Sequence, residues 1–471
     1  MEEAKEGLMD GGSHLAKISA TLSHLQNLDA SHDDDLVLLI DAYDIWFQLP
    51  RSALVDRYYN IVHHANRRLA SRLGQEAMVQ ESISQTVVFG SGKRCAPNQI
   101  HTIACYPIPD SPLPDDMYYN NTDTDLGQTE QTLHKHRWLN SGSIMGPVKN
   151  MRDMFARAEE IVKSHPEEDP EDNGTHGSVD IYHGSDQSIF AKMWGEQEFQ
   201  REVIRRRYGG DPKAEQNPGT NKKEMQGTGK LTNLWRRLAG SRPAGIIKKH
   251  LSKRGTGNVD ALRPYDILSP PFTHEHMDPL DGHPAEFGIG VDYFADLSHQ
   301  TVNSVNDVRW LLHSQPLADQ ITDRTRWDCK WRLPEDGLPE DILSEESMEV
   351  LWDIMGAEGE EQRNATLWED QLLYTHLCLG TIPVMIHHNG DKEARERVWD
   401  RLWWHQYAKG VLDRNLQSEE LGEMVDWEGH IEQPRAGTGA KWGGAWTAGE
   451  SHEFLRYDDM CSREWDDELF G

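Results

Sequence analysis

LVLLIDAYDIWF, residues 36–47, is the stretch of the sequence that decides the fold class. Five consecutive apolar residues follow three aspartates, and a continuous apolar run of this length is typical of a buried parallel strand. The run ends in Asp41-Ala42-Tyr43-Asp44. Ligands of open α/β sheets bind beyond the carboxyl ends of the strands. Asp41 and Asp44 are therefore candidate site residues.

The two aspartates offer hard oxygen ligands, which suit Mn²⁺ or Mg²⁺. A divalent ion held there neutralises a diphosphate leaving group, as the transfer of a sugar from a nucleotide donor requires. An ordinary turn, in which Asp41 caps and Asp44 is a solvated acid, remains open. A phosphatase-type aspartate nucleophile is disfavoured, because the spacing is D-x-x-D and not D-x-D.

Working outward, the periodicity predicts alternating helices and strands and hence an α/β fold. An apolar stripe at helical spacing ends at Gly74, where a helix is expected to stop. Residues 138–146 are interpreted as a tight turn that leads into a strand. The expected helices are 14–29, the stripe Leu54-Tyr58-Ile61-Ala65-Leu69, the stripe Met151-Phe155-Ala158-Val162 and 186–194; the further expected strands are 86–89 and 381–386.

His387 follows the strand expected at 381–386, and imidazole is a normal ligand for ions of the Mn²⁺ class. A histidine in this position is also a common structural residue, and His388 is an adjacent competitor. The next residues predict a flexible turn, and they are Asn389, Gly390 and Lys392. The ammonium group of Lys392 is a candidate to bind a diphosphate.

Two other segments carry small or acidic polar groups. Asn140, Ser141 and Gly142 place an exposed backbone beside a bound sugar, or form a plain turn. Asp186 heads a predicted helix, where an acid is a good cap. The alternative for Asp186 is a role as a base or as a sugar ligand.

Composition excludes some classes of function. The net charge of −31 argues against a partner that is a nucleic acid or an anionic membrane. No apolar run has the length of a membrane span. Five scattered cysteines without a CxxC pair disfavour a structural zinc site. Cys95 and Cys105 either close a small disulfide loop or remain thiols. Sequons at Asn120, Asn173 and Asn364 hint at a secretory lumen.

Two regions differ in composition from the rest of this acidic chain. Residues 201–256 form a basic insert of low hydrophobicity, for which we expect a partly disordered loop or a site for an anionic partner. Residues 393–471 form a Trp-rich extension, in which the tryptophans are expected to be structural. We therefore divide the chain into a domain at 1–392 and the extension.

In order, six blocks resemble the glycosyltransferase domain of the procollagen lysyl hydroxylase proteins, which modify collagen, and of their fungal relatives. They span residues 36–392, with large unmatched insertions between them. The blocks are LVLLIDAYDIWF (36–47), TVVFGSG (86–92), RWLNSGSIMG (137–146), SDQSIF (185–190), GIGVDYFADLSHQT (288–301) and IPVMIHHNGDK (382–392).

The resemblance implies a GT-A fold, in which a mixed sheet is flanked by helices, and transfer of a hexose from a UDP-sugar to a hydroxyl acceptor on a glycan or protein. Its Mn²⁺ ligands fall on Asp41, Asp44 and His387, and its donor-side turn falls on Asn140 to Gly142. The acidic cluster of the family is reduced here to Asp186, and the turn before Lys392 is one residue shorter. A location in the Golgi or endoplasmic reticulum lumen is also implied.

Only 35 residues precede the strand at 36–40, too few for the first nucleotide-binding strand and loop of such a domain. The sequence therefore predicts a truncated GT-A-like domain. Our first hypothesis is a hexosyltransferase, with Asp186 and Asn140 as catalytic residues and Asn140 to Gly142, Asn389, Gly390 and Lys392 on the donor. The alternative is a non-catalytic relative that acts as a binding or scaffold module.

Overall fold

The computed structural model describes most of the chain up to residue 420 and a few positions beyond it. The described residues are 12–122, 130–164, 181, 184–210, 266–268, 286–321, 329–330, 332, 337–390 and 392–420, followed by 424–425, 431–432, 444–446, 454–457, 466 and 470. Most of the basic insert, from residue 211 onward, lies outside this set. So does most of the tail beyond residue 420.

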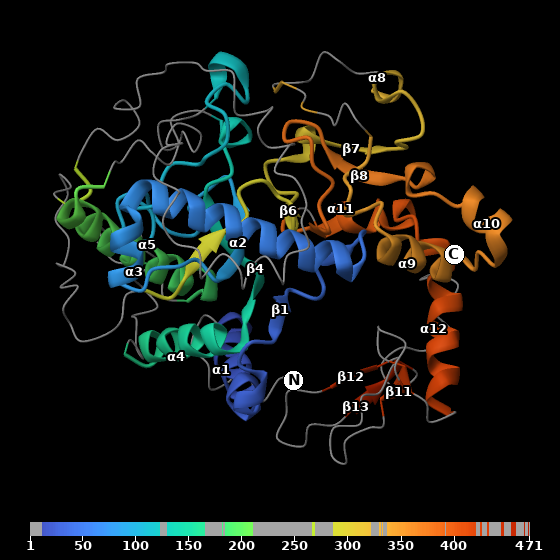
Figure 1. Cartoon of the computed structure of the whole chain (residues 1–471), viewed down its shortest axis with the longest axis horizontal. Helices are drawn as coiled ribbons and strands as arrows, with labels where there is room; N and C mark the ends of the chain where they lie inside the picture. Colours follow the sequence, from blue (N-terminus) through green and yellow to red (C-terminus); the bar gives the residue numbers. More distant parts are fainter. Residues whose placement is uncertain are drawn as a thin grey trace.

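A mixed sheet of seven strands forms the centre of the molecule (Figure 1). Its order is β1 (Leu36–Ile40), β4 (Trp138–Pro147), β3 (Val87–Gly92), β6 (Ser298–Gln300), β9 (Met385–His387) and β2 (Ile45–Phe47), with β5 (Ile289–Val291) paired to β3 outside this path. The pairs of β3 with β5, β3 with β6 and β6 with β9 are parallel, and the others are antiparallel.

Helices cover both faces of this sheet, so the described chain is a three-layer α/β structure, as predicted. On one face lie α1 (Gly12–Asn27), α4 (Val148–Ser164) and α5 (Asp186–Tyr208), and on the other lie α2 (Arg51–Leu73) and α9 (Glu345–Met355). The side chains of β3 alternate between the two cores. Val87 and Phe89 pack with the first set of helices, while Val88 packs with the second.

The helical stripes seen in the sequence face the core as expected, and all their residues are buried except Val162, which is partly buried. All five residues of the α2 stripe, from Leu54 to Leu69, are buried, and the helix ends before Gly74 at φ 90°. The prediction of a partly disordered insert at 201–256 stays a prediction, because residues 211–256 lie outside the described residues, but its first residues are helical. The segment 201–208 completes α5, because Glu202 pairs with Arg205 and Arg206 at helical spacing.

The expectation that residues 36–40 form a buried parallel strand is wrong in its pairing. β1 runs antiparallel to β4 and stands at one end of the strand order, and its residues are half-buried. Its continuous apolar run has another cause. Val37 and Leu39 pack against one core, and Leu36, Leu38 and Ile40 pack against the other. Two covered faces, and not parallel pairing, require apolar residues at every position.

The expected tight turn at 138–146 is also wrong. Residues 138–147 form the ten-residue strand β4, which pairs with β1 through its second half and with β3 along its length. The irregularity read as a turn is a register shift opposite Phe89 and Gly90. Gly90 leaves little room there, since a Cβ on it would lie 2.9 Å from the Ser143 hydroxyl.

A smaller sheet and two disulfides complete the core. β7 (Val308–Leu311) pairs antiparallel with β8 (Leu373–His376). Cys95 and Cys105 form the loop disulfide that the sequence left open. Cys329 and Cys378 form a second disulfide that the sequence did not reveal, since the two positions are 49 residues apart.

The first part of the C-terminal extension packs on the core. Trp403 lies in the core beside α2, and its indole N–H donates to the carbonyl of Gln48 at 2.8 Å. Trp399 and Trp404 pack around the small sheet. These tryptophans therefore have structural contacts. The division of the chain at residue 392 stays a prediction.

The other described elements are short, except α12. None of the described helices combines the length and the apolar character that a membrane crossing needs. These elements are the helices α3 (Gln75–Gln80), α8 (Leu317–Gln320), α10 (Gly359–Ala365), α11 (Lys392–Glu396) and α12 (His405–Glu420), and the strand pairs β10 (Met424–Val425) with β11 (Ile431–Glu432) and β12 (Gly444–Trp446) with β13 (Phe454–Arg456).

Candidate functional site

The segment Asp41–Asp44 joins the two strands at opposite ends of the strand order, β1 and β2. The sheet therefore curls until its ends meet at these four residues. The segment is a turn in which the Asp44 N–H donates to the Asp41 carbonyl at 2.9 Å. The D-x-x-D spacing thus places one acid at each corner of a tight turn, and Tyr43 between them is 88% exposed.

Backbone hydrogen bonds fix this turn on both sides. The Asp41 N–H donates to the carbonyl of Gly142 in β4 at 2.8 Å, and the N–H of His388 donates to the Asp44 carbonyl at 2.7 Å. Strand β9 lies beside β2, with His387 opposite Ile45. Asp41 and Asp44 are consequently brought to the same place as His387, which the sequence singled out in a separate segment.

His387 is buried and faces Asp41. Its Nε2 lies 4.0 Å from Asp41 Oδ2. The ring rests against the backbone of Gly142, where an added Cβ would lie only 2.1 Å from His387 Cε1. Gly142 is therefore the residue whose missing side chain admits the imidazole. The sequence assigned Gly142 to a donor-side turn and missed this contact.

A lysine that the sequence did not reveal holds two of the acids. Lys17 Nζ, on α1, lies 2.9 Å from Asp41 Oδ1 and 3.2 Å from Asp186 Oδ2, and it donates to the Ser141 carbonyl at 2.7 Å. Asp186 is buried at the start of α5. Lys17 thus links Asp186 to Asp41. From the sequence, only the apolar stripe of this helix could be recognised.

A second cation, Arg395 of α11, contacts the turn from the other side. Its Nη1 lies 3.1 Å from Asp44 Oδ1 and donates to the carbonyl of Tyr43. In this arrangement Asp41, Asp44 and His387 do not bring three ligand atoms within 4.8 Å of one another, as two other groups among the described residues do. Binding of a shared ion by all three therefore requires at least one of these side chains to move.

Asn140 is used inside the protein. Its Oδ1 accepts from the Gly142 N–H at 3.0 Å, and its Nδ2 donates to Gln187 Oε1 at 2.8 Å. Gln187, beside Asp186 on α5, also donates to the carbonyl of Ala96. The amide of Asn140 therefore fastens β4 to α5. A direct role of Asn140 in catalysis stays a prediction.

The turn after His387 is fastened as well. Asn389 donates to Gln300 Oε1 at 2.8 Å and accepts from the Val302 N–H at 3.2 Å. Gly390 lies against Val302. Lys392 begins α11, and its side chain lies outside the described residues, so its assignment to a diphosphate stays a prediction.

Comparison with known proteins adds no further assignment. No protein-family model matches the chain, and no curated protein matches its sequence. The chemistry of the site therefore rests on its own residues. Two carboxylates and one imidazole, with two cations beside them, surround the point where the curled sheet closes. Carboxylate oxygens and imidazole nitrogens are ligand types that divalent ions of the Mg²⁺ or Mn²⁺ class accept.

Proposed function

We propose that the chain is a metal-dependent glycosyltransferase of the GT-A type, which moves a hexose from a UDP-sugar to a hydroxyl group of a glycan or protein. The observation that carries the proposal is the convergence of Asp41, Asp44 and His387 at the closure of the sheet. These residues come from segments up to 346 positions apart (387 − 41). The resemblance of the six sequence blocks supports the same activity.

Asp41, Asp44 and His387 would hold Mn²⁺ or Mg²⁺. The close approach of Gly142 to the ring of His387 supports this fit, because it fixes the imidazole beside Asp41. The ion would supply the positive charge that stabilises the departing diphosphate. Lys17 already places one positive charge between Asp41 and Asp186 at this point.

The acids and amides around the ion would position the sugar. The carboxylate of Asp186, buried at the start of α5, is an acceptor for sugar hydroxyl groups beside Asp41. When the ion binds, Arg395 would leave Asp44 and bind the diphosphate, because the geometry of a guanidinium matches that of phosphate oxygens. Asn140 and Gln187 would keep β4 and α5 in register around the donor.

The two disulfides favour an oxidising compartment for this activity, because such bonds are rare where thiols are kept reduced. A secretory lumen is therefore the proposed location. It is also the location in which protein and glycan hydroxyl acceptors are modified.

The proposal is tested by the thermal stability of the purified chain with Mn²⁺ and UDP. A ligand that binds only the folded chain raises its melting temperature. We expect a shift that needs both ligands and that disappears in Asp44→Asn. Asp353→Asn, which changes an exposed acid on α9, is the control and should keep the shift. An equal shift in both variants would remove Asp44 from the site.

A second function is favoured by one contact. Lys17 already neutralises Asp41, as an ion-free binding module would require. That alternative, a non-catalytic binding or scaffold module that has lost donor binding, predicts no stabilisation by Mn²⁺ with UDP and no release of UDP from any UDP-hexose. Turnover of a UDP-hexose by the wild-type chain, lost in Asp44→Asn, excludes it.

A further inference from the structure

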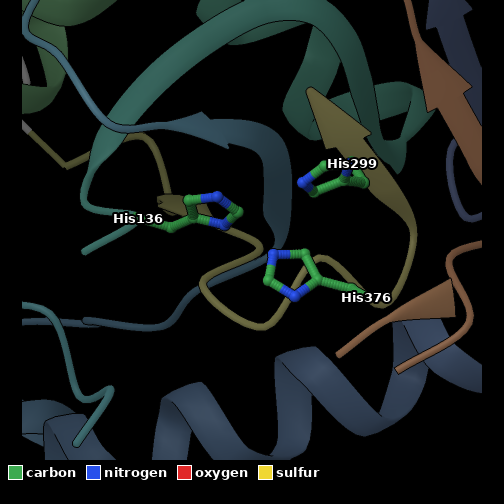
Figure 2. A group of neighbouring side chains, drawn as sticks. All are labelled: His136, His299 and His376. Atoms are coloured by element: carbon green, nitrogen blue, oxygen red, sulfur yellow. The ribbon is translucent and has the colours of Figure 1, made fainter. Parts of the chain in front are cut away.

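Three buried histidines lie together in a second place, on β6, on β8 and just before β4. His136, His299 and His376 are 1%, 0% and 0% exposed, and their ligand atoms lie within 4.8 Å of one another. Figure 2 shows the three rings turned toward one another in a shared space. The ring centroids of His299 and His376 are 4.7 Å apart, and those of His136 and His376 are 5.7 Å apart.

Most of the ring nitrogens in this cluster have no hydrogen-bond partner among the described residues. These are both nitrogens of His136, Nε2 of His299 and Nε2 of His376. A buried polar atom without a partner costs about 1–3 kcal/mol, so native proteins rarely leave several together. Four such atoms on three adjoining rings indicate that something else satisfies them.

The outward nitrogens of two rings are held. Nδ1 of His299 lies 3.0 Å from the hydroxyl oxygen of Tyr374. With its proton on Nδ1, donated to Tyr374, His299 directs the lone pair of Nε2 into the cluster. Metal-binding histidines are commonly oriented by such a bond from the other nitrogen. Nδ1 of His376 accepts the N–H of Leu379 at 3.2 Å, which places the ring proton on Nε2; an ion that binds Nε2 therefore requires this proton to move to Nδ1 and the hydrogen bond from Leu379 to open.

Burial keeps all three rings in the form that binds metals. It lowers the pKa of His136 to about 3 and those of His299 and His376 well below the ordinary value. The nearby ammonium of Lys93 acts in the same direction, and it is itself paired with Asp307 at 2.6 Å. A carboxylate, that of Asp307, also lies beside the cluster, with Oδ2 4.0 Å from His376 Nε2.

We propose that His136, His299 and His376 bind one transition-metal ion, with Zn²⁺ as the ion that suits a ligand set of three imidazoles. Imidazole nitrogens bind Zn²⁺ at about 2.0–2.1 Å, so the three nitrogens, which lie within 4.8 Å of one another, draw together on binding. The other close group, Asp307 with Cys329 and Cys378, offers no thiolates, because the two cysteines are bonded to each other.

The ion has a structural role, distinct from the site at Asp41. It joins the segment before β4, the central strand β6 and the small sheet, which are brought together from positions 136, 299 and 376. Its ligands are all nitrogen, whereas the site at Asp41 offers mainly oxygen. The two sites are therefore separable by the atoms that surround the bound metal, and the inference does not depend on the proposed function.

The first experiment measures zinc in the full chain. The protein is loaded with Zn²⁺, passed over a weak chelator, and analysed for metal content and X-ray absorption. We expect one zinc per chain, with three imidazole nitrogens at about 2.0–2.1 Å. Asp44→Asn should keep this zinc. A wild-type chain without retained zinc, or a zinc surrounded mainly by oxygen, would overturn the proposal.

Variants locate the ion. His299→Gln should lose the zinc, whereas His313→Gln should keep it, since His313 is partly buried and bonded to Thr375 outside the cluster. Tyr374→Phe keeps the ring but removes the hydroxyl that orients His299, and we expect zinc affinity to fall by about 10–100-fold. If His299→Gln does not fold, Tyr374→Phe decides, and an unchanged zinc affinity in it overturns the assignment.

Discussion

At the scale of single residues, the candidate site at Asp41 depends on the space that Gly142 leaves for His387. A Cβ on Gly142 would lie 2.1 Å from His387 Cε1, so Gly142→Ala must displace the ring. We expect the variant to lose about 1–3 kcal/mol of stability through overpacking. We also expect it to lose the stabilisation by Mn²⁺ with UDP, measured by thermal unfolding.

Gly410→Ala is the control for this substitution. Gly410 lies within α12, with no atom near the added Cβ, so alanine should stabilise the helix by about 0.5–1 kcal/mol and leave the response to Mn²⁺ and UDP unchanged. If Gly142→Ala retained that response, His387 would not be a ligand.

Lys17 competes with any metal ion for Asp41, so its removal should favour the ion. In Lys17→Met the ammonium that lies 2.9 Å from Asp41 Oδ1 is removed, and with it the repulsion of a divalent ion. We expect Mn²⁺ to bind on the order of tenfold more tightly, because like charges at this distance repel by a kilocalorie or more even in water. Calorimetric titration measures this change. Weaker binding would show that Lys17 positions Asp41 instead.

At the scale of elements, the sequence predicts those helices whose burial follows the spacing of their apolar residues. The helices α1, α2 and α4 follow from apolar stripes, because each buries one face in the core. The pairing of β1 was not predictable in this way. An apolar residue at every position shows that both faces are covered, and it does not show the direction of the neighbouring strand. In the sequence, the only signal of the register shift in β4 is a run of glycines and other small residues, and such residues are also typical of turns.

The candidate site was predictable to the same extent. Asp41, Asp44 and His387 follow or end strands, and strand ends gather at the edge of a sheet. Lys17 and Arg395 were missed, because cations on the polar face of a helix carry no local signal. The three buried histidines were missed because they meet only through tertiary packing, with a sequence separation of 240 between the first and the last (376 − 136).

The two disulfides make unequal contributions in the loop-entropy description of cross-links. Cys329–Cys378 spans 49 residues and Cys95–Cys105 spans 10. Replacing both cysteines of a pair by serine should therefore lower the free energy of unfolding by about 4 kcal/mol for the longer loop and about 3 kcal/mol for the shorter. Urea unfolding of the two double variants measures this order. A larger loss for the shorter loop would show that strain or packing outweighs chain entropy.

At the scale of the whole molecule, buried histidines make the fold sensitive to acid. Burial lowers the pKa of His313 to about 4, and burial together with neighbouring cations lowers that of His64 to about 4. Unfolded chains bind these protons below their ordinary pKa of 6.5, and the folded chain does not. The stability that they contribute is therefore fully present above pH 6.5 and is lost as the pH falls toward 4.

Asp292 acts in the opposite sense over an overlapping range of pH. Burial, and next the charge of Asp296, raise the pKa of Asp292 from 3.8 to about 7, so its contribution is fully present below pH 3.8 and is lost as the pH rises through 7.

We expect His313→Gln to reduce the acid-induced loss of stability, by at most about 1.4 kcal/mol per pH unit and by less where solvent screens the ring. Asp292→Asn should steepen that loss, because it removes the opposing contribution. Urea midpoints of the three proteins between pH 4 and pH 7 measure both effects, and parallel profiles for all three would contradict the assignment of acid sensitivity to these groups.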